Sequence, residues 1–335
     1  MSSAPLVGLL VAMLVVAPAF GSVRLGSSAG ETLIGTNKAD QITGGGGNDT
    51  LKGLAGNDTY YFEDGWGSDT LEEKASYKVG GKKVSGGRDT LSFRGVTTGW
   101  VDVYLVPAWG SGYNLALGQH GEQIVLGASL VENAVGGPSG TVGDRLVGGG
   151  EANTLSSGGG SGDTLQDFGG WNDGAGGQPE LPASSDTFRG AAANTGTVIL
   201  QDWGGSADVL DFRPLASDEV YLDAVNCDDD PQRECLQVVT GTGDGQVAVV
   251  GQFGEFDTST TESGQHGRIE ILRFADGDIR MDGDVRVSAA SATGSATGKP
   301  LTKRQQAEAK QAPALLEAAL RELDDLPEPG ALPRR

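Results

Sequence analysis

The stretch of sequence that decides the fold is a run of three consecutive nonapeptides. Residues 35–61 read GTNKADQIT, GGGGNDTLK and GLAGNDTYY. The sixth place of each nonapeptide is aspartate and the eighth is a large apolar or aromatic residue: Asp40, Asp49 and Asp58, and Ile42, Leu51 and Tyr60. A fixed period of this kind indicates a repeat architecture, and a glycine-rich linker, the alternative, has no reason to keep such a register.

Further copies of the pattern follow with more deviations. A degenerate nonapeptide, DGWGSDTLE, begins at Asp64 and places Asp69 and Leu71 in the same relation. A weaker set appears later, in which leucine follows two residues after Asp144, Asn153 and Asp163. We therefore expect a first repeat array at residues 30–75, a β-strand extension at 76–135 and a second, degenerate array at 136–190.

The nonapeptide predicts an all-β fold, a parallel β-roll built from the repeats. Six residues form a turn that needs glycine, because the backbone turns tightly and often adopts positive φ. The remaining three residues form a short strand with one side chain pointing inward, so stacked repeats enclose a thin core between two sheets.

The same unit predicts a cation at the turns. Its carbonyl oxygens point inward, and stacking brings the aspartates of neighbouring turns together. Six or more oxygens at about 2.3 to 2.6 Å suit calcium better than magnesium. Neither array contains histidine or cysteine, which disfavours softer metals.

The run GGGGNDTLKGLAGNDTYYF, within residues 35–71, resembles the RTX (haemolysin-type) calcium-binding repeats of proteins exported by Gram-negative bacteria. The resemblance implies calcium ligation by residues of the first array: Asp40, Gly44, Gly45, Gly47, Asn48, Asp49, Gly53, Gly56, Asn57, Asp58 and Asp69. In the second array it adds Asp144 and Asp163.

The N-terminus is typical of an exported protein. An apolar run of about 15 residues ends in Ala17-Pro18-Ala19, a small-x-small cleavage pattern. We expect residues 1–19 to be a signal peptide, with no stable membrane span after cleavage and a secreted, extracellular or cell-surface location. An oxidising compartment would let Cys227 and Cys235 form a disulfide; two free thiols are the alternative.

The chain is strongly acidic. It carries 45 acidic and 24 basic residues, a formal charge of −21. Nucleic acid is excluded as a partner class, because phosphate contacts need clustered lysine and arginine. Divalent cations would neutralise the self-repulsion of such a chain, although solubility in a salty medium also explains the charge.

The C-terminal part is expected to cap the roll. Asp-Gly turns between short β-rich runs predict a β-rich cap with hairpins at residues 191–287. Small polar residues predict a linker at 288–300, and an apolar stripe predicts a short helical segment at 301–326.

The residues offer little for catalysis. Only His120 and His266 are present and no HExxH motif occurs, so the chain lacks the ligands of a zinc protease. A structural or interaction role for the calcium-folded roll is favoured over catalysis. Two alternatives stay open: a cell-surface adhesin, and a secreted polysaccharide hydrolase or lyase using a groove lined by tryptophans, namely Trp100, Trp109, Trp171 and Trp203.

Overall fold

The computed structural model describes the following residues: 21–105, 114–126, 131–138, 143–160, 162–167, 184–190, 197–202, 207–226, 234–240, 246–249 and 269–281. The predicted signal peptide, linker and C-terminal helical segment lie outside these ranges, and so does Cys227 of the predicted disulfide. No helix within the described ranges is long and apolar enough to cross a membrane.

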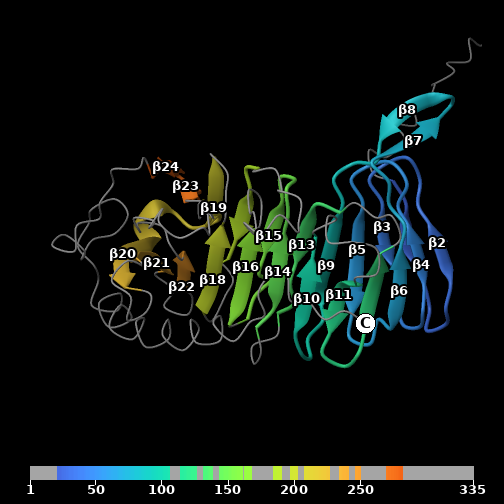
Figure 1. Cartoon of the computed structure of the whole chain (residues 1–335), viewed down its shortest axis with the longest axis horizontal. Coiled ribbons are helices and arrows are strands. Elements are labelled where there is room, and N and C mark those ends of the chain that lie inside the picture. The colour runs from blue at the N-terminus through green and yellow to red at the C-terminus, as the bar shows by residue number, and fades with distance from the viewer. Residues whose placement is uncertain are drawn as a thin grey trace, which may run out of the picture.

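Two long sheets make up the roll, and consecutive strands of the repeats alternate between them (Figure 1). Sheet I contains, in spatial order, β1 (Val23–Leu25), β3 (Gln41–Thr43), β5 (Thr59–Glu63), β9 (Thr90–Gly95), β13 (Asn133–Val135), β15 (Thr154–Ser156), β17 (Thr187–Arg189), β19 (Asp208–Asp211), β23 (Ile269–Phe274) and β24 (Gly277–Arg280). Sheet II contains β2 (Thr32–Ile34), β4 (Thr50–Lys52), β6 (Ser68–Leu71), β12 (Gln123–Leu126), β11 (Asn114–Gly118), β10 (Val101–Tyr104), β14 (Arg145–Gly148), β16 (Asp163–Asp167), β18 (Thr197–Asp202), β22 (Gln246–Val249), β21 (Glu234–Thr240) and β20 (Val220–Asn226).

The register of the strands follows the nonapeptide. Ile42 of β3 is the partner of Tyr60 of β5, two repeats along, and the two strands are parallel. In sheet II, Leu51 of β4 is likewise the parallel partner of Leu71 of β6. The parallel β-roll predicted from the repeats is thereby confirmed.

The core is a single file of side chains between the sheets. The apolar residue at the eighth place of each repeat has no exposed surface, as Ile42, Leu51 and Tyr60 illustrate. Burying one such side chain contributes about 1.5 to 3 kcal/mol. Because each three-residue strand buries only one, the core is thin, and the turns must contribute to stability as well.

The stack begins earlier than the residue 30 predicted for the first array. Strands β1 and β2 flank the turn GSSAGE (residues 26–31) and pair in parallel with β3 and β4, respectively. In that turn Glu31 stands where the other repeats have aspartate, so a pattern keyed on aspartate does not include it.

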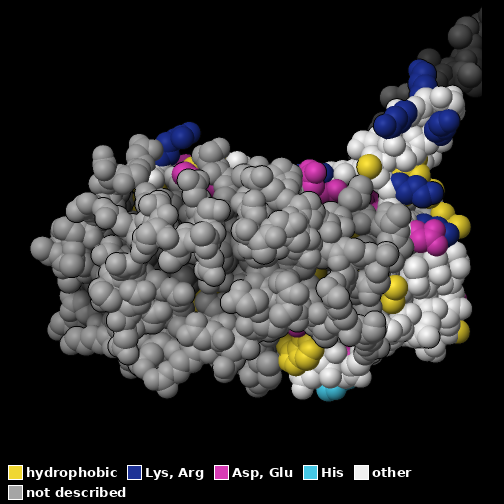
Figure 2. Space-filling view, viewed as in Figure 1, with side chains coloured by type: hydrophobic (Ala, Val, Ile, Leu, Met, Phe, Trp, Pro, Cys, Tyr) yellow, Lys and Arg dark blue, Asp and Glu magenta, His cyan; other side chains and the backbone are white. Residues whose placement is uncertain are grey.

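The region between the arrays is more varied than a simple extension. Strands β9 and β13 continue sheet I in parallel, whereas β10, β11 and β12 form an antiparallel insertion in sheet II. A separate hairpin of β7 (Ser76–Val79) and β8 (Lys82–Ser85) projects from the roll (Figure 1). Lysine and arginine side chains gather over this hairpin (Figure 2).

The part of the chain that was expected to cap the roll contains both hairpins and strands that continue the roll. Strands β23 and β24 do form an antiparallel hairpin, and β20 and β21 form a second one. Strands β18 and β19, however, continue the parallel ladders with β16 and β17. Val198, Ile199 and Leu200 of β18 are consecutive and all buried, the pattern of a parallel strand covered on both faces.

Candidate metal centre along the roll edges

The aspartates of the first array stand where each glycine turn ends and a strand begins. Asp40 and Asp58 lead into strands of sheet I, whereas Asp49 and Asp69 lie at the start of strands of sheet II. The two pairs therefore belong to two separate rows of turns, not to one cluster. All four are at least 98% buried, which is unusual for carboxylates and calls for compensating contacts.

One oxygen of each carboxylate links neighbouring turns of the same row. The backbone N–H of Asp40 donates to Oδ1 of Asp58 over 2.7 Å, and that of Asp49 donates to Oδ1 of Asp69 over 2.9 Å. The N–H of Asp58 donates in turn to Oδ1 of Asp89 over 2.8 Å. The aspartates thus form ladders along the roll.

The second oxygen is left without a donor at three of these residues. Oδ2 of Asp49, Asp58 and Asp69 is buried and receives no hydrogen bond from the residues that the structure describes. Leaving one buried polar atom unpaired costs about 1 to 3 kcal/mol, more for a charged group. A cation bound at these oxygens would remove that cost.

Glycine leaves the space in which such a cation would lie. A Cβ placed on Gly44 would be 2.7 Å from Oδ2 of Asp49 and 3.5 Å from Oδ2 of Asp69. On the other row, a Cβ on Gly53 would be only 2.1 Å from Oδ2 of Asp58. The unpaired oxygens of neighbouring turns therefore approach the space beside a glycine.

The other predicted residues serve the turns. Gly45, Gly47 and Gly56 have φ of +85°, +101° and +126°, a region that favours glycine. Asn48 and Asn57 are exposed, and their Oδ1 atoms accept hydrogen bonds from the N–H groups of Ser68 and Arg88. Their side chains hold turns together at the surface, unlike the buried aspartates.

Electrostatics at the ladder favour a bound cation. Burial raises the pKa of Asp58 to about 6 and that of Asp69 to about 7, and it also raises the pKa of Asp49. Asp40 differs, because hydrogen bonds from Ser22 and Thr36 outweigh the effect of burial and hold its pKa below the ordinary value. Both oxygens of Asp40 already have donors, so Asp49 and Asp69 form the better-supported site.

A tyrosine and a glutamate occupy the turn next to Asp58. The hydroxyl of Tyr60 donates to Oε1 of buried Glu73, which also accepts the N–H of Gly53 over 2.7 Å. The hydroxyl of Tyr77 donates to Oε2 of Glu73 over 2.8 Å. Tyr60, predicted only as a core residue, thus also binds a second carboxylate at this row.

The second array repeats the ladder with changes. The N–H of Asp144 donates to Oδ1 of Asp163 over 2.9 Å, and Oδ2 of Asp163 has no donor among the described residues. Both oxygens of Asp144 accept backbone N–H groups, from Val101 and Gly137. Of the two predicted ligands, only Asp163 resembles Asp49 and Asp69.

Several ladder residues were not predicted from the sequence. Asp89, Glu132, Asp186, Asp208 and Glu270 each accept a backbone N–H from an earlier turn. The signal for three of them was present as a short motif in which aspartate is followed two residues later by a large apolar residue: DTL at 89–91, DTF at 186–188 and DVL at 208–210. Of these, DTF at 186–188 is recognisable from the sequence as an isolated echo of the pattern, but insertions remove all three from the regular spacing of nine, so none was assigned as a ligand.

The residues of the first array fit calcium. Buried carboxylate oxygens without donors, glycine-lined space and inward turns supply only hard oxygen ligands, which calcium prefers. Asp49, Asp69 and the turn at Gly44 would hold the ion in one row, and Asp58 with the turn at Gly53 would contribute in the other. Bound calcium would replace repulsion between carboxylates with attraction.

Comparison with known protein families agrees with this geometry. Residues 25–60 match the RTX calcium-binding nonapeptide repeat in four copies. The matched segment begins at the end of β1 and includes the turn with Glu31. A search of curated proteins found no match.

The fold and the repeats together define a calcium-binding β-roll. The segment from residue 25 to residue 60 consists of RTX repeats, as the nonapeptide pattern predicted. Calcium binding by this segment follows from the repeat family; the ligand assigned to each residue remains a prediction.

Proposed function

We propose that this is an exported protein in which calcium binding to the RTX repeats folds the β-roll, and that the folded roll has a structural or interaction role. The observation that carries the proposal is the ladder of buried aspartates with one oxygen unpaired. Without a cation these carboxylates repel one another inside a thin core, and the bound ion would convert this cost into stability.

Such a design would couple folding to location. Calcium is scarce in the cytoplasm and plentiful outside the cell, so the chain would stay loosened before export and fold afterwards. The apolar run before Ala19, typical of a signal peptide, supports this order of events.

The ligand assignment is tested by calcium titration calorimetry on the full chain. The variant Asp49→Asn/Asp69→Asn keeps the size of both side chains and removes two charges from one row. We expect it to lose at least one calcium equivalent or to bind it roughly 10 to 100 times more weakly.

A matched control removes two charges from exposed positions. The Glu63→Gln/Glu72→Gln variant changes the net charge equally, at residues with side chains exposed to solvent. It should bind calcium as the wild type does. Equal loss in both variants would mean that net charge, and not ligation, governs binding.

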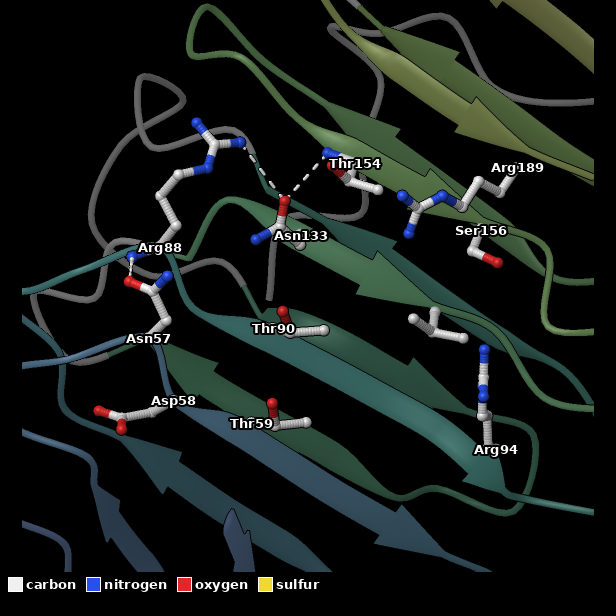
Figure 3. A pocket seen from close by; sticks show the side chains of 11 residues that line it. Asn57, Asp58, Thr59, Arg88, Thr90, Arg94, Asn133, Thr154, Ser156 and Arg189 are labelled. Atoms are coloured by element: carbon white, nitrogen blue, oxygen red, sulfur yellow. Dashed lines mark hydrogen bonds between the residues drawn. The ribbon is translucent and has the colours of Figure 1, made fainter. Parts of the chain in front are cut away.

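A groove on the outer face of sheet I favours a second role, binding of an acidic polysaccharide. The groove has a volume of about 350 Å³ and is lined by hydroxyl side chains such as Thr59, Thr90 and Thr154. Arg88 lies at one end, and Arg94 and Arg189 lie at the other (Figure 3). Three arginines on one face are notable in a chain with a charge of −21.

The chemistry of the groove suits a chain of sugar acids. Arginine binds carboxylates through paired N–H groups, and threonine hydroxyls can exchange hydrogen bonds with sugar hydroxyls. Arg189 forms an ion pair with Asp211, whereas Arg94 takes part in no ion pair with any described residue. Arg94 is therefore the most available cation for a ligand.

The test compares binding to a polyuronate and to a neutral glucan, in calcium. Arg94→Gln should weaken polyuronate binding several-fold, and Lys78→Gln on the projecting hairpin serves as the control. Binding should also weaken with salt. If the protein releases new chain ends from the polyuronate, the hydrolase or lyase alternative is favoured. Equal binding to the polyuronate and to the neutral glucan would contradict a role for the arginines.

A further inference from the structure

Four buried aspartates gather in one turn row beyond the segment that matches the RTX repeats. Asp167 ends β16 and Asp202 ends β18, both in sheet II. Asp186 precedes β17, and Asp208 begins β19, both in sheet I. Each of the four side chains is at least 99% buried.

Two of these aspartates replace glycine of the repeat. In the first array, Gly35 and Gly53 follow the sheet II strands and begin the turns that lead to Asp40 and Asp58. In the later turns, Gly148, Asp167 and Asp202 follow one another in register across β14, β16 and β18. The place of glycine is therefore kept at Gly148 and taken by a carboxylate in the next two turns.

The replacement brings several carboxylates together. One carboxylate oxygen from each of Asp167, Asp186 and Asp202 lies within 4.8 Å of the other two. A Cβ on Gly148 would be 2.5 Å from Oδ1 of Asp167, so this side chain extends into the row of turns beneath the glycine. The distances suit oxygens that share one cation.

Asp208 supplies an independent indication of a ligand. Its Oδ1 accepts the N–H of Asp186 over 2.7 Å, but its Oδ2 is buried and receives no N–H or hydroxyl donor from the described part of the chain. The neighbouring carboxyl of Asp202 can share a hydrogen bond with Asp208 only if one of the two holds a proton. A cation between them would satisfy both carboxylates without a proton.

We propose that Asp167, Asp186, Asp202 and Asp208 form a cation site that differs in composition from the sites of the repeats. In the first array, the same row has Asp40 and Asp58 with Gly35 and Gly53 opposite them. A carboxylate, Glu73, takes the glycine place at the next turn, and there the hydroxyls of Tyr60 and Tyr77 donate to it. The later site has four carboxylates, a formal charge of −4. It is a site for a hard cation, and its charge favours calcium strongly and a trivalent lanthanide still more.

This site has a consequence for the order of binding. Calcium affinity rises with the number of charged ligands, so the four-carboxylate site fills at a lower calcium concentration than the repeats. Filling it would fix strands β16 to β19, and the repeats at the other end of the roll would order at higher calcium. The proposal does not depend on binding by the first array, because its residues are separate.

The experiment is calcium titration calorimetry on the full, calcium-stripped chain, with terbium(III) as a second probe. The variant Asp167→Asn/Asp202→Asn removes the two unusual carboxylates and keeps their size. We expect it to lose the tightest calcium component, or to weaken it at least about tenfold, and to lose the preference for terbium over calcium. The Asp49→Asn/Asp69→Asn variant is the matched control and should keep the tightest component.

Two results would overturn the proposal. The first is an unchanged tightest component in Asp167→Asn/Asp202→Asn, which would mean that shared protons satisfy the four carboxylates. The second result concerns folding. If Asp167→Asn/Asp202→Asn does not reach the wild-type circular dichroism signal at saturating calcium, the single variant Asp208→Asn is titrated in its place. An unchanged affinity of the tightest calcium component in Asp208→Asn would then contradict the four-aspartate site. If Asp49→Asn/Asp69→Asn loses a weaker calcium component, that result concerns the ligands of the first array and not the four-aspartate site.

Discussion

Glycine serves the turns in two ways: it tolerates positive φ, and it leaves room for the backbone of the neighbouring turn. Gly56 and Gly65 allow these two effects to be separated. Gly56 has a φ of +126°, and a Cβ there would be 2.4 Å from the backbone carbon of Lys38. Gly65 also has positive φ, +77°, but a Cβ there would meet no atom within 4 Å. The first position suffers both strain and collision, and the second suffers strain alone.

We therefore predict different costs for the same substitution. Gly65→Ala should lower the free energy of unfolding by about 1 kcal/mol, the cost of left-handed backbone in a non-glycine residue. Gly56→Ala should lower it by more than about 2 kcal/mol, because the backbone of the neighbouring turn must move. Urea unfolding at saturating calcium measures both, and equal losses would show that the turns do not stack as closely as described.

A buried carboxylate should have opposite effects with and without calcium. Asp69 has no exposed surface, and burial raises its pKa to about 7. In calcium-free solution at pH 7.5, Asp69→Asn should raise the free energy of unfolding, because it removes a buried negative charge. At saturating calcium the same change should lower it, because a ligand is lost.

Two measurements test this reversal: the far-ultraviolet β-sheet signal in chelator, which the variant should retain more strongly than the wild type, and the midpoint of thermal unfolding in calcium, which should fall. The control is Glu63→Gln, at an exposed residue, which should change both measurements little. A change of the same sign for Asp69→Asn in both solutions would argue that this carboxylate does not bind the ion.

Among the elements, the first array gains support from an aromatic layer where the insertion meets the roll. Trp66 is 98% buried, and its ring centroid lies 5.9 Å from that of Phe62 and 5.4 Å from that of Phe93. Its Nε1 has no acceptor among the residues that the structure describes. Packing, not hydrogen bonding, therefore accounts for its contribution.

Two substitutions of Trp66 should therefore lower the free energy of unfolding by different amounts. Trp66→Ala should cost about 3 to 5 kcal/mol of unfolding free energy, because it leaves a cavity beside two aromatic rings. Trp66→Phe should cost less than about 1.5 kcal/mol, since it keeps a ring and removes the unpaired N–H. Urea unfolding in calcium distinguishes the two; equal costs would mean that the indole N–H has an essential partner.

The sequence predicts these elements unevenly, for physical reasons. The register from β3 to β5 could be predicted because the three nonapeptides have the same length and keep aspartate at one place, and the motif DTL shows the same relation again at Asp69 after a two-residue insertion. The turn before β2 was missed because Glu31 replaces aspartate, and β18 and β19 were assigned to the cap because insertions hide their spacing. Asp167 and Asp202 could not be recognised as site residues, because only the pairing of β14, β16 and β18 places them in register with Gly148.

At the scale of the whole molecule, the buried carboxylates determine how the calcium-free chain responds to pH. Burial raises the pKa of Asp58 to about 6, of Asp69 to about 7 and of Asp163 to about 8, above the ordinary value of 3.8. The folded chain therefore binds more protons than the unfolded chain between about pH 4 and pH 8. Stability falls as pH rises through a window of this kind.

We predict that the calcium-free chain is more stable at pH 4.5 than at pH 7.5. Far-ultraviolet circular dichroism of the calcium-stripped protein at the two values measures this: the β-sheet signal should be stronger at pH 4.5, and a stronger signal at pH 7.5 would contradict the prediction. In calcium the order should reverse, because protons compete with the ion for the same oxygens.

The central claim is that calcium folds the roll, and far-ultraviolet circular dichroism of the full chain tests it most directly. The spectrum is recorded at pH 7.5 in excess chelator, in calcium, and after the chelator is added back. The account predicts a strong β-sheet signal in calcium that is lost on chelation and restored by calcium. A β-sheet signal of the same strength in chelator would contradict it.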